Sequence, residues 1–303
     1  MKISCPMCST SVAYSTSVWE YEFSELVQCN NCGLIHHLRN DMLHAEQAFT
    51  TYHNNSWGHG FEDVSEFNIN SSEIMQHAAR IEFNLQYFSK FLNITEDDCV
   101  LDIGAGVGLL EFVAQETNSP IHNTNLVMIE PVVENYRLLR KRYPNHTAVN
   151  CHINQIRNVT PTYDAIFCQG VDYLFGDINE SFKILHGLLK PDGLMLISRN
   201  LFIDMPCYFG GKPIGNKADI FSPNALINAY FLETHYKEFL EKNFDIVDEM
   251  NYEEKYGESS DLVVGQIYNY VLKKKDSSYD ETPLDETKYL TQYNETLKRL
   301  SKK

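Results

Sequence analysis

The chain has 303 residues, of which 43% are hydrophobic, and this length suits one α/β domain with a small appendage. The formal net charge of −16 opposes the approach of a phosphate backbone, so nucleic acid is a disfavoured partner. The sequence has no signal-peptide pattern and no apolar run as long as a membrane span, so we expect a cytoplasmic protein without a membrane partner.

The first forty residues contain two C-x-x-C pairs separated by about twenty residues. In a reducing cytoplasm this pattern favours a structural zinc site over disulfides, because each pair supplies two thiolates of a tetrahedron. The expected ligands are Cys5, Cys8, Cys29 and Cys32, with His36 and His37 as alternatives. A four-cysteine set has no open position for catalysis, so the segment looks like a zinc ribbon. The sequence leaves open whether the zinc ion only stabilises this short segment or whether the segment also docks a substrate or partner.

Residues 41–72 lack clear periodicity, and we interpret them as a linker or a cover over the site. A helix is then predicted from Ser71 or Ser72 to Leu92, because apolar residues recur on one of its faces.

The stretch Val100–Leu110, VLDIGAGVGLL, has the pattern of a buried strand, a tight glycine turn and a helix. Glycine is required where a ligand lies too close to the backbone for a Cβ atom. The glycines of this turn are Gly104, Gly106 and Gly108. A pyrophosphate-binding turn needs a further glycine where this chain has Leu109, and the carboxylate of Asp102 would repel a pyrophosphate. S-adenosylmethionine (SAM) has no phosphate and carries two cationic groups, so it fits this pattern better than NAD.

A second acid follows the next predicted strand, Asn125–Ile129. Glu130 ends that strand about twenty residues after the glycine turn, where a carboxylate accepts hydrogen bonds from ribose hydroxyls. Pro131 then precedes a predicted helix, Val132–Tyr143.

These residues resemble motifs of the class I SAM-dependent methyltransferases. Asp102 to Gly108 resembles motif I, and Glu130 resembles the ribose-binding acid. Leu188–Ser198, LLKPDGLMLIS, is similar to the helix, Pro-Gly turn and fifth strand of that family. The resemblance covers roughly residues 75–272 and implies a seven-stranded Rossmann-like α/β sheet with an antiparallel last hairpin. The alternative is a protein that keeps this fold but no longer binds the cofactor.

The resemblance also implies the cofactor contacts. The family often has an acid after its third strand, but here His152 and Asn154 accompany the end of the predicted strand Thr147–Ile153. Asn154 or a backbone carbonyl is therefore the expected adenine acceptor, and Arg80 is a candidate for the methionine carboxylate or an acidic substrate. The complete expected cofactor set is Asp102, Gly104, Ala105, Gly106, Gly108, Glu130, Pro131, Asn154, Gln169 and Arg80.

The predicted fourth strand, Tyr163–Cys168, delivers its following residues to the crevice at the carboxyl edge of the sheet. Asp172 and Tyr173 are the catalytic candidates. The general base is Asp172, a histidine from elsewhere or absent, and Tyr173 is equally compatible with covering the cofactor. The substrate candidates follow the fifth strand and are Arg199, Asn200, Asp204 and Tyr208.

The remaining elements complete the predicted domain. Helices are expected at Ile178–Leu189 and Asn224–Asn243, and strands at Leu194–Ser198, Phe244–Val247 and Leu262–Leu272. The predicted organisation is a zinc ribbon at 1–40, a linker at 41–72, a methyltransferase domain at 73–273, and a polar linker with a C-terminal helix at 274–303. That last helix is a candidate contact for a homodimer.

A short ribbon beside such a domain resembles bacterial methyltransferases that act on sugars or other small metabolites. The resemblance implies O-methylation of a small polar acceptor. One alternative is an RNA methyltransferase that uses the ribbon to contact RNA, against which the acidic charge argues. The other is a non-catalytic scaffold, against which the presence of both Asp102 and Glu130 argues.

Overall fold

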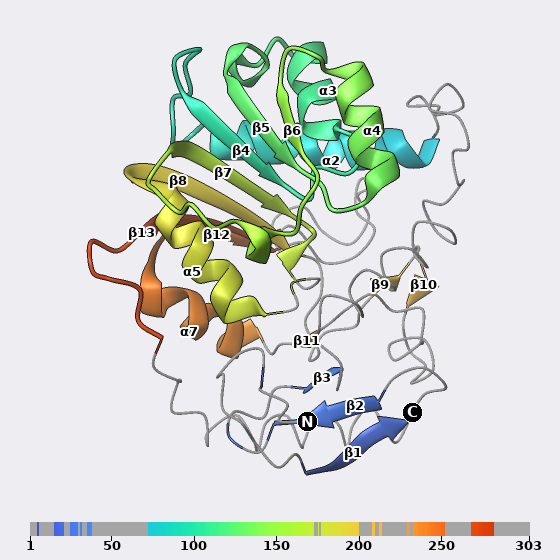
Figure 1. Cartoon of the computed structure of the whole chain (residues 1–303), viewed down its shortest axis with the longest axis vertical. Coiled ribbons are helices and arrows are strands. Elements are labelled where there is room, and N and C mark those ends of the chain that lie inside the picture. The colour runs from blue at the N-terminus through green and yellow to red at the C-terminus, as the bar shows by residue number, and fades with distance from the viewer. Residues whose placement is uncertain are drawn as a thin grey trace.

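The computed structural model describes residues 5, 15–20, 25–29, 31, 35–37, 72–172, 175, 177–199, 208–209, 212–213, 229–230, 233–251 and 268–281. Its centre is a seven-stranded sheet in the order β12-β13-β8-β7-β4-β5-β6 (Figure 1). The strands are β4 (Cys99–Ile103), β5 (Asn125–Ile129), β6 (Thr147–Val149), β7 (Tyr163–Gln169), β8 (Leu189–Arg199), β12 (Phe244–Asn251) and β13 (Tyr268–Lys274). Strands β4 to β8 are parallel, whereas β13 is antiparallel to both of its neighbours. This topology confirms the predicted sheet and its antiparallel last hairpin.

Helices cover both faces of the sheet, as Figure 1 shows. On one face are α2 (Ser72–Phe88), α3 (Leu109–Glu116) and α4 (Val133–Arg142), and on the other are α5 (Ile178–Leu188) and α7 (Glu233–Asn243). The α2 residues in this core include Ala78, Ile81, Leu85 and Phe88, at the spacing of one helical face. Asp177 caps the start of α5, because its carboxylate accepts a hydrogen bond from the Glu180 backbone N–H.

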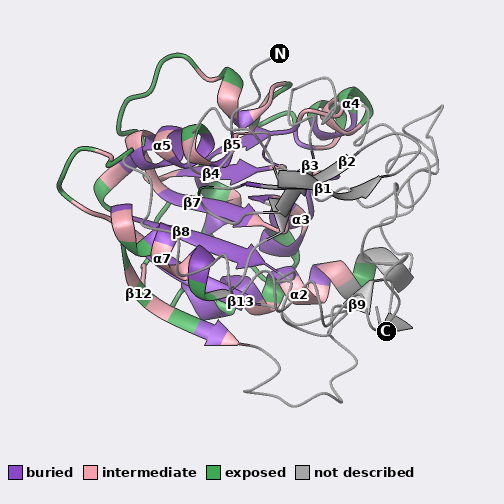
Figure 2. Cartoon of the chain, turned by 90° about the horizontal axis from the view of Figure 1, so that it is seen from below, coloured by how far each residue is buried: buried purple, intermediate pink, exposed green. Residues whose placement is uncertain are grey.

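The central strands are buried on both faces, and Figure 2 shows β4, β7 and β8 largely in the colour of buried residues. Their side chains alternate between two apolar clusters. Leu101 and Ile166 pack against the α5 and α7 side, whereas Val100 and Phe167 pack against the α2 and α3 side. A parallel sheet covered on both faces has near-continuous apolar strands. The apolar runs of the sequence therefore fit these strands.

The third and fifth predicted strands have different bounds in the structure. Strand β6 ends at Val149 instead of Ile153, because His152 and Gln155 form a capping box that starts the 3₁₀ helix η3 (Ile153–Gln155). Strand β8 begins at Leu189, so the Pro-Gly stretch is a register shift within the strand. A Cβ atom at Gly193 would lie 2.8 Å from the Tyr163 carbonyl oxygen, which explains a glycine at this point.

The helix predicted at Asn224–Asn243 is wrong at Ala229–Tyr230. Residues Ala229–Tyr230 form β11, and α7 begins at Glu233. Strand β11 pairs with β3 (Ile35–His37), which completes a four-stranded sheet with β1 (Ser15–Glu20) and β2 (Glu25–Gln28). A short pair, β9 (Tyr208–Phe209) and β10 (Lys212–Pro213), comes from the segment between β8 and β11. The pairing of β11 with β3 overrides the local helical pattern.

The segment after β13 contacts the body of the domain. The Tyr279 hydroxyl donates a hydrogen bond to Asn179 Oδ1 at 3.0 Å, and the Asp280 N–H donates to Asn243 Oδ1 at 2.6 Å. The interpreted cover at 41–71 and the C-terminal helix expected after residue 281 lie outside the described residues. Within the described part of the chain, no helix combines the length and hydropathy needed to cross a membrane.

Candidate active site

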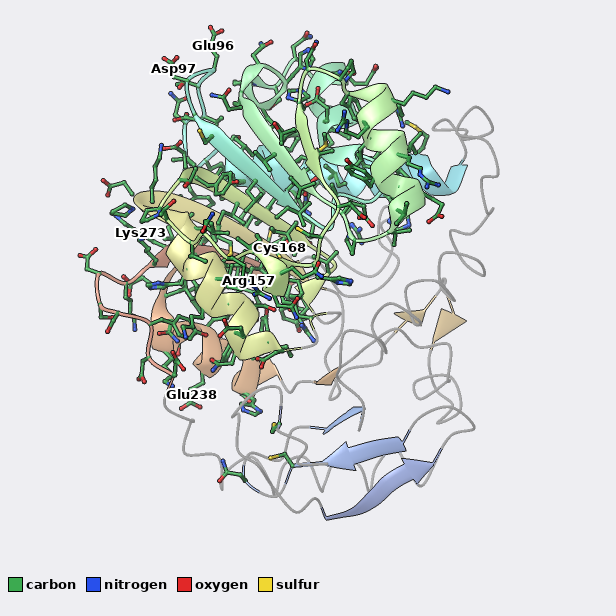
Figure 3. All side chains as sticks on the ribbon, viewed as in Figure 1. Glu96, Asp97, Arg157, Cys168, Glu238 and Lys273 are labelled. Atoms are coloured by element: carbon green, nitrogen blue, oxygen red, sulfur yellow. The ribbon has the colours of Figure 1, made fainter. Side chains whose placement is uncertain are left out.

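The glycine turn lies at the carboxyl ends of the parallel strands. Figure 3 shows Cys168 near this end of β7, whereas Glu96 and Asp97 lie at the opposite end of the sheet, in the turn before β4. The three glycines have φ values of 67°, 56° and 82°. A Cβ atom at Gly104 would lie 2.6 Å from Val171, whereas a Cβ atom at Gly106 would meet no atom of the described residues closer than 4.0 Å. Gly106 therefore borders open space where a ligand can approach the backbone.

Two buried carboxylates flank this turn. Asp102 on β4 is 5% exposed, and Glu130 immediately after β5 is 4% exposed. Glu130 accepts hydrogen bonds from the Gly106 N–H and the Val132 N–H, each at 2.8 Å. Among the described residues, no Lys, Arg or His forms an ion pair with either carboxylate. The site thus holds two acids without a cation.

Burial controls the ionisation of both groups. It raises the pKa of Asp102 from 3.8 to about 7, and the charge of Glu130 adds to this increase. Burial also raises the pKa of Glu130 from 4.5 to about 7, although hydrogen bonds from Val132 and Gly106 act in the opposite direction. The folded chain therefore holds these protons more tightly than the unfolded chain, and ionising the groups costs stability as the pH rises from about 4 to about 7. A bound cation would favour the ionised forms.

Two other expected cofactor residues present amide side chains near the same edge. Asn154, in η3, has a buried Oδ1 atom with no hydrogen-bond partner among the described residues. Gln169, at the end of β7, accepts a hydrogen bond from Asn84 Nδ2 at 2.7 Å. Asn84 in turn accepts one from Asn269 Nδ2 at 2.7 Å, and both asparagines are fully buried. This chain of amides fixes the Gln169 side chain through its oxygen.

The remaining expected cofactor residues lie close by in the fold. Pro131 follows Glu130, and its carbonyl accepts a hydrogen bond from Asn150 Nδ2 at 2.9 Å. Ala105 is buried within the glycine turn, and its N–H donates to the Ile129 carbonyl at 3.0 Å. Arg80 is half-buried on α2, which packs against α3.

Asp172 and Arg199 form an ion pair in the interior. Arg199 Nη1 donates to Asp172 Oδ2, and the Tyr236 hydroxyl donates to the same oxygen at 2.6 Å. The Arg199 guanidinium carbon lies 4.7 Å from the centre of the Tyr236 ring, and all three residues are at most 1% exposed. The structure thus joins a catalytic candidate directly to a substrate candidate, and a tyrosine of α7 contacts both. The Asp172 Oδ1 atom has no hydrogen-bond partner among the described residues.

Several candidates lie beyond what the structure describes. The residues that lie outside the described part of the chain are Tyr173, Asn200, Asp204, Cys8 and Cys32. The side chains that lie outside it are those of Tyr208, His36 and His37. Cys5 and Cys29, one from each C-x-x-C pair, are 1% and 0% exposed.

Sequence reasoning missed Tyr236 and the two buried asparagines. Helical spacing alone does not reveal which group the Tyr236 hydroxyl meets. Asn84 interrupts the apolar face of α2, and Asn269 lies in an apolar strand. A polar residue in such a pattern is the signal that could have found them, since buried amides require hydrogen-bond partners.

No protein-family model and no curated protein matches the sequence. The fold, however, matches solved structures. A SAM-dependent methyltransferase of Leishmania major is 16% identical with a TM-score of 0.52, over 77% of this chain and 85% of that one. This chain has a methyltransferase fold. The PH0226 protein of Pyrococcus horikoshii OT3 is also 16% identical, with a TM-score of 0.51 over 71% of this chain and 97% of that one. At such identities the methyltransferase likeness concerns the fold, so function has to be argued from the site.

Proposed function

We propose that the protein is a SAM-dependent methyltransferase that acts on a small polar acceptor. The observation that carries the proposal is the pair of buried carboxylates, Asp102 and Glu130, beside a glycine turn that is open at Gly106. Two buried acids without a cationic partner among the described residues suit a ligand that carries positive charge and hydroxyl groups. A pyrophosphate ligand would instead be repelled.

The residues present fit such a cofactor. Glu130 would accept hydrogen bonds from the ribose hydroxyls, and Asp102 would attract the cationic end of the ligand. Asn154 Oδ1 is a buried acceptor with no partner in the described part of the chain, and it suits the adenine amino group. Arg80 and Gln169 remain candidates for the methionine end. When bound, SAM supplies a sulfonium methyl group to a nucleophile aligned with it.

The acceptor side is built around Asp172. Its Oδ2 atom is engaged by Arg199 and Tyr236, and its Oδ1 atom is buried without a partner among the described residues. Asp172 would therefore take a proton from a substrate hydroxyl through Oδ1, once binding of the acceptor brings the hydroxyl to it. We propose Asp172 and Tyr173 as the catalytic pair, and Arg199, Asn200, Asp204 and Tyr208 as the substrate side. We further propose O-methylation of a sugar or related metabolite. The net charge of −16 disfavours the RNA alternative, which would require steeply salt-dependent binding.

We also propose that the N-terminal segment binds a structural zinc ion through Cys5, Cys8, Cys29 and Cys32. The support is the spacing of the two pairs together with the burial of Cys5 and Cys29. Bound Co²⁺ would show sulfur-to-metal charge-transfer absorption here, because all four ligands are thiolates.

The Glu130→Gln variant should lose about 100-fold in affinity for S-adenosylhomocysteine, because hydrogen bonds to a charged acceptor are replaced by bonds to a neutral amide. Isothermal titration calorimetry measures this loss, and circular dichroism checks the fold. The control is Glu134→Gln, which neutralises an exposed acid on α4 and should leave affinity unchanged. Equal affinity of wild type and Glu130→Gln would show that the ribose lies elsewhere.

Binding of SAM should weaken as the pH is lowered from 8 to 6. The pKa values of Asp102 and Glu130 are raised to about 7, and the ligand favours their ionised forms. Below these pKa values, binding of the ligand must displace protons from the two acids. The affinity then falls about tenfold per pH unit for each proton that is displaced. Calorimetry in buffers of different ionisation enthalpy measures the released protons. Affinity and proton release that stay constant from pH 6 to pH 8 would contradict this assignment.

A further inference from the structure

A second polar cluster lies outside the proposed cofactor site, where three segments meet. Glu111 is in the first turn of α3, His122 is in the 3₁₀ helix η2 (Pro120–Asn123), and His146 directly precedes β6. Glu111 Oε1 lies 2.6 Å from His122 Nδ1 and 3.0 Å from His146 Nε2. The Glu111 side chain is 0% exposed, that of His146 is 8% exposed, and that of His122 is 42% exposed. A deeply buried carboxylate thus lies beside one exposed and one largely buried imidazole.

The hydrogen bonds of this carboxylate are unevenly distributed. Its Oε1 atom faces both imidazoles and also accepts from Gln115 Nε2 at 3.0 Å. Its Oε2 atom is buried and has no hydrogen-bond partner in the described part of the chain. No Lys or Arg of that part forms an ion pair with Glu111. Positive charge nearby stabilises an ionised carboxylate that is buried, and a bound cation between these side chains would supply it.

We propose that Glu111, His122 and His146 bind a divalent transition-metal ion such as Zn²⁺. One carboxylate oxygen and two imidazole nitrogens all lie within 4.8 Å of one another. Tetrahedral Zn²⁺ with bonds of roughly 2.1 Å places its ligand atoms about 3.4 Å apart, which small side-chain shifts would give here. The exposure of His122 leaves room for water as a fourth ligand. Zn²⁺, with its preference for imidazole and carboxylate, supplies the positive charge that Glu111 lacks.

The ion would act as a structural clip. It would tie η2 and the segment before β6 to α3, the helix that begins directly after the glycine turn. This site shares no residue with the proposed cysteine site, and its ligand atoms are nitrogen and oxygen instead of sulfur. Bound Co²⁺ would therefore show ligand-field bands without sulfur-to-metal charge transfer, and the two sites are separable by absorption.

The test uses the full-length chain, depleted of metal and titrated with Co²⁺ and then Zn²⁺. The Cys29→Ser variant weakens the proposed cysteine site, and His122→Asn is then added to it. Asparagine keeps an N–H donor for Glu111 but is a poor metal ligand, so it separates metal binding from hydrogen bonding. We expect Cys29→Ser to show the ligand-field bands of a nitrogen and oxygen site with weaker thiolate absorption than the intact chain. The double variant should bind Co²⁺ at the nitrogen and oxygen site at least about tenfold more weakly.

Thermal unfolding gives a second readout. Zn²⁺ should raise the melting temperature of Cys29→Ser more than that of the double variant, since an ion stabilises only the chain that binds it. In the chain with all cysteines intact, His122→Asn alone should lower the metal content by one ion per chain. Equal Co²⁺ affinity with and without His122, or equal metal content of the intact chain and its His122→Asn variant, would overturn the proposal. Binding of S-adenosylhomocysteine, measured on the same samples, tests the cofactor site separately.

Discussion

Replacing Arg199 with methionine should lower the free energy of unfolding by about 3–5 kcal/mol, because it leaves the Asp172 carboxylate buried without its cation. Asp172 and Arg199 are each 1% exposed, so water cannot replace the lost partner. The change also removes the stacking of the guanidinium on the Tyr236 ring. Urea unfolding followed by circular dichroism measures the loss.

Two further variants show whether the unpaired charge causes this effect. Tyr236→Phe removes one hydrogen bond to Asp172 and keeps Arg199, so it should cost only about 1–2 kcal/mol. The double variant Asp172→Asn/Arg199→Met removes both charges and should recover much of the stability lost in Arg199→Met. The single variant Asp172→Asn completes the comparison. If the double variant loses as much stability as Arg199→Met and Asp172→Asn added together, the pair does not act through charge.

Adding one methyl group at Gly106 should weaken SAM binding by about 10–100-fold, because the methyl group takes up space that the ligand needs. The fold should tolerate Gly106→Ala. In the described part of the chain its Cβ atom meets nothing closer than 4.0 Å, so the main cost is a φ of 56°, about 1–2 kcal/mol for alanine. Calorimetry with S-adenosylhomocysteine measures the loss of ligand affinity, and thermal unfolding measures the loss of stability.

The matched control is Gly108→Ala in the same turn. Here φ is 82°, and the Cβ atom would overlap the Tyr143 ring and lie 2.8 Å from Leu139. The Tyr143 hydroxyl donates to the Gly108 carbonyl at 3.0 Å, so the tyrosine cannot move away without losing that bond. We expect a loss of about 2–4 kcal/mol in stability. A Gly106→Ala variant that binds normally would place the ligand away from the glycine turn.

Local patterns are sufficient to predict the seven-stranded sheet and the edge at which the proposed cofactor site lies. The apolar run before Gly104 and the acid after Ile129 are each contained in one short segment, and the structure has a strand at both places. Because β4 and β5 are parallel neighbours, their carboxyl ends lie together at one edge of the sheet. The sequence pattern is enough to predict this arrangement. The burial that raises the pKa values of Asp102 and Glu130 follows from that position.

Other features depend on contacts that no local pattern contains. The partner of Asp172 is set by β8 and α7 together, so the sequence suggests a catalytic and a substrate residue where the structure shows an ion pair. Glu111 and the two histidines come from three segments joined by short connections. Likewise, Ala229 lies in a strand because a distant edge is available to pair with it.

The pairing of β3 with β11 also constrains the order in which the chain folds. Ile35 pairs with Tyr230, so this contact closes a loop of about 200 residues. During synthesis, the N-terminal sheet stays incomplete until residue 230 has left the ribosome, and by then β4 to β8 have already emerged. A fragment cut after the first forty residues would lack β11 and expose the edge of β3, which would promote intermolecular strand pairing. The N-terminal strands and the segment after β8 are therefore best expressed and studied as parts of one chain.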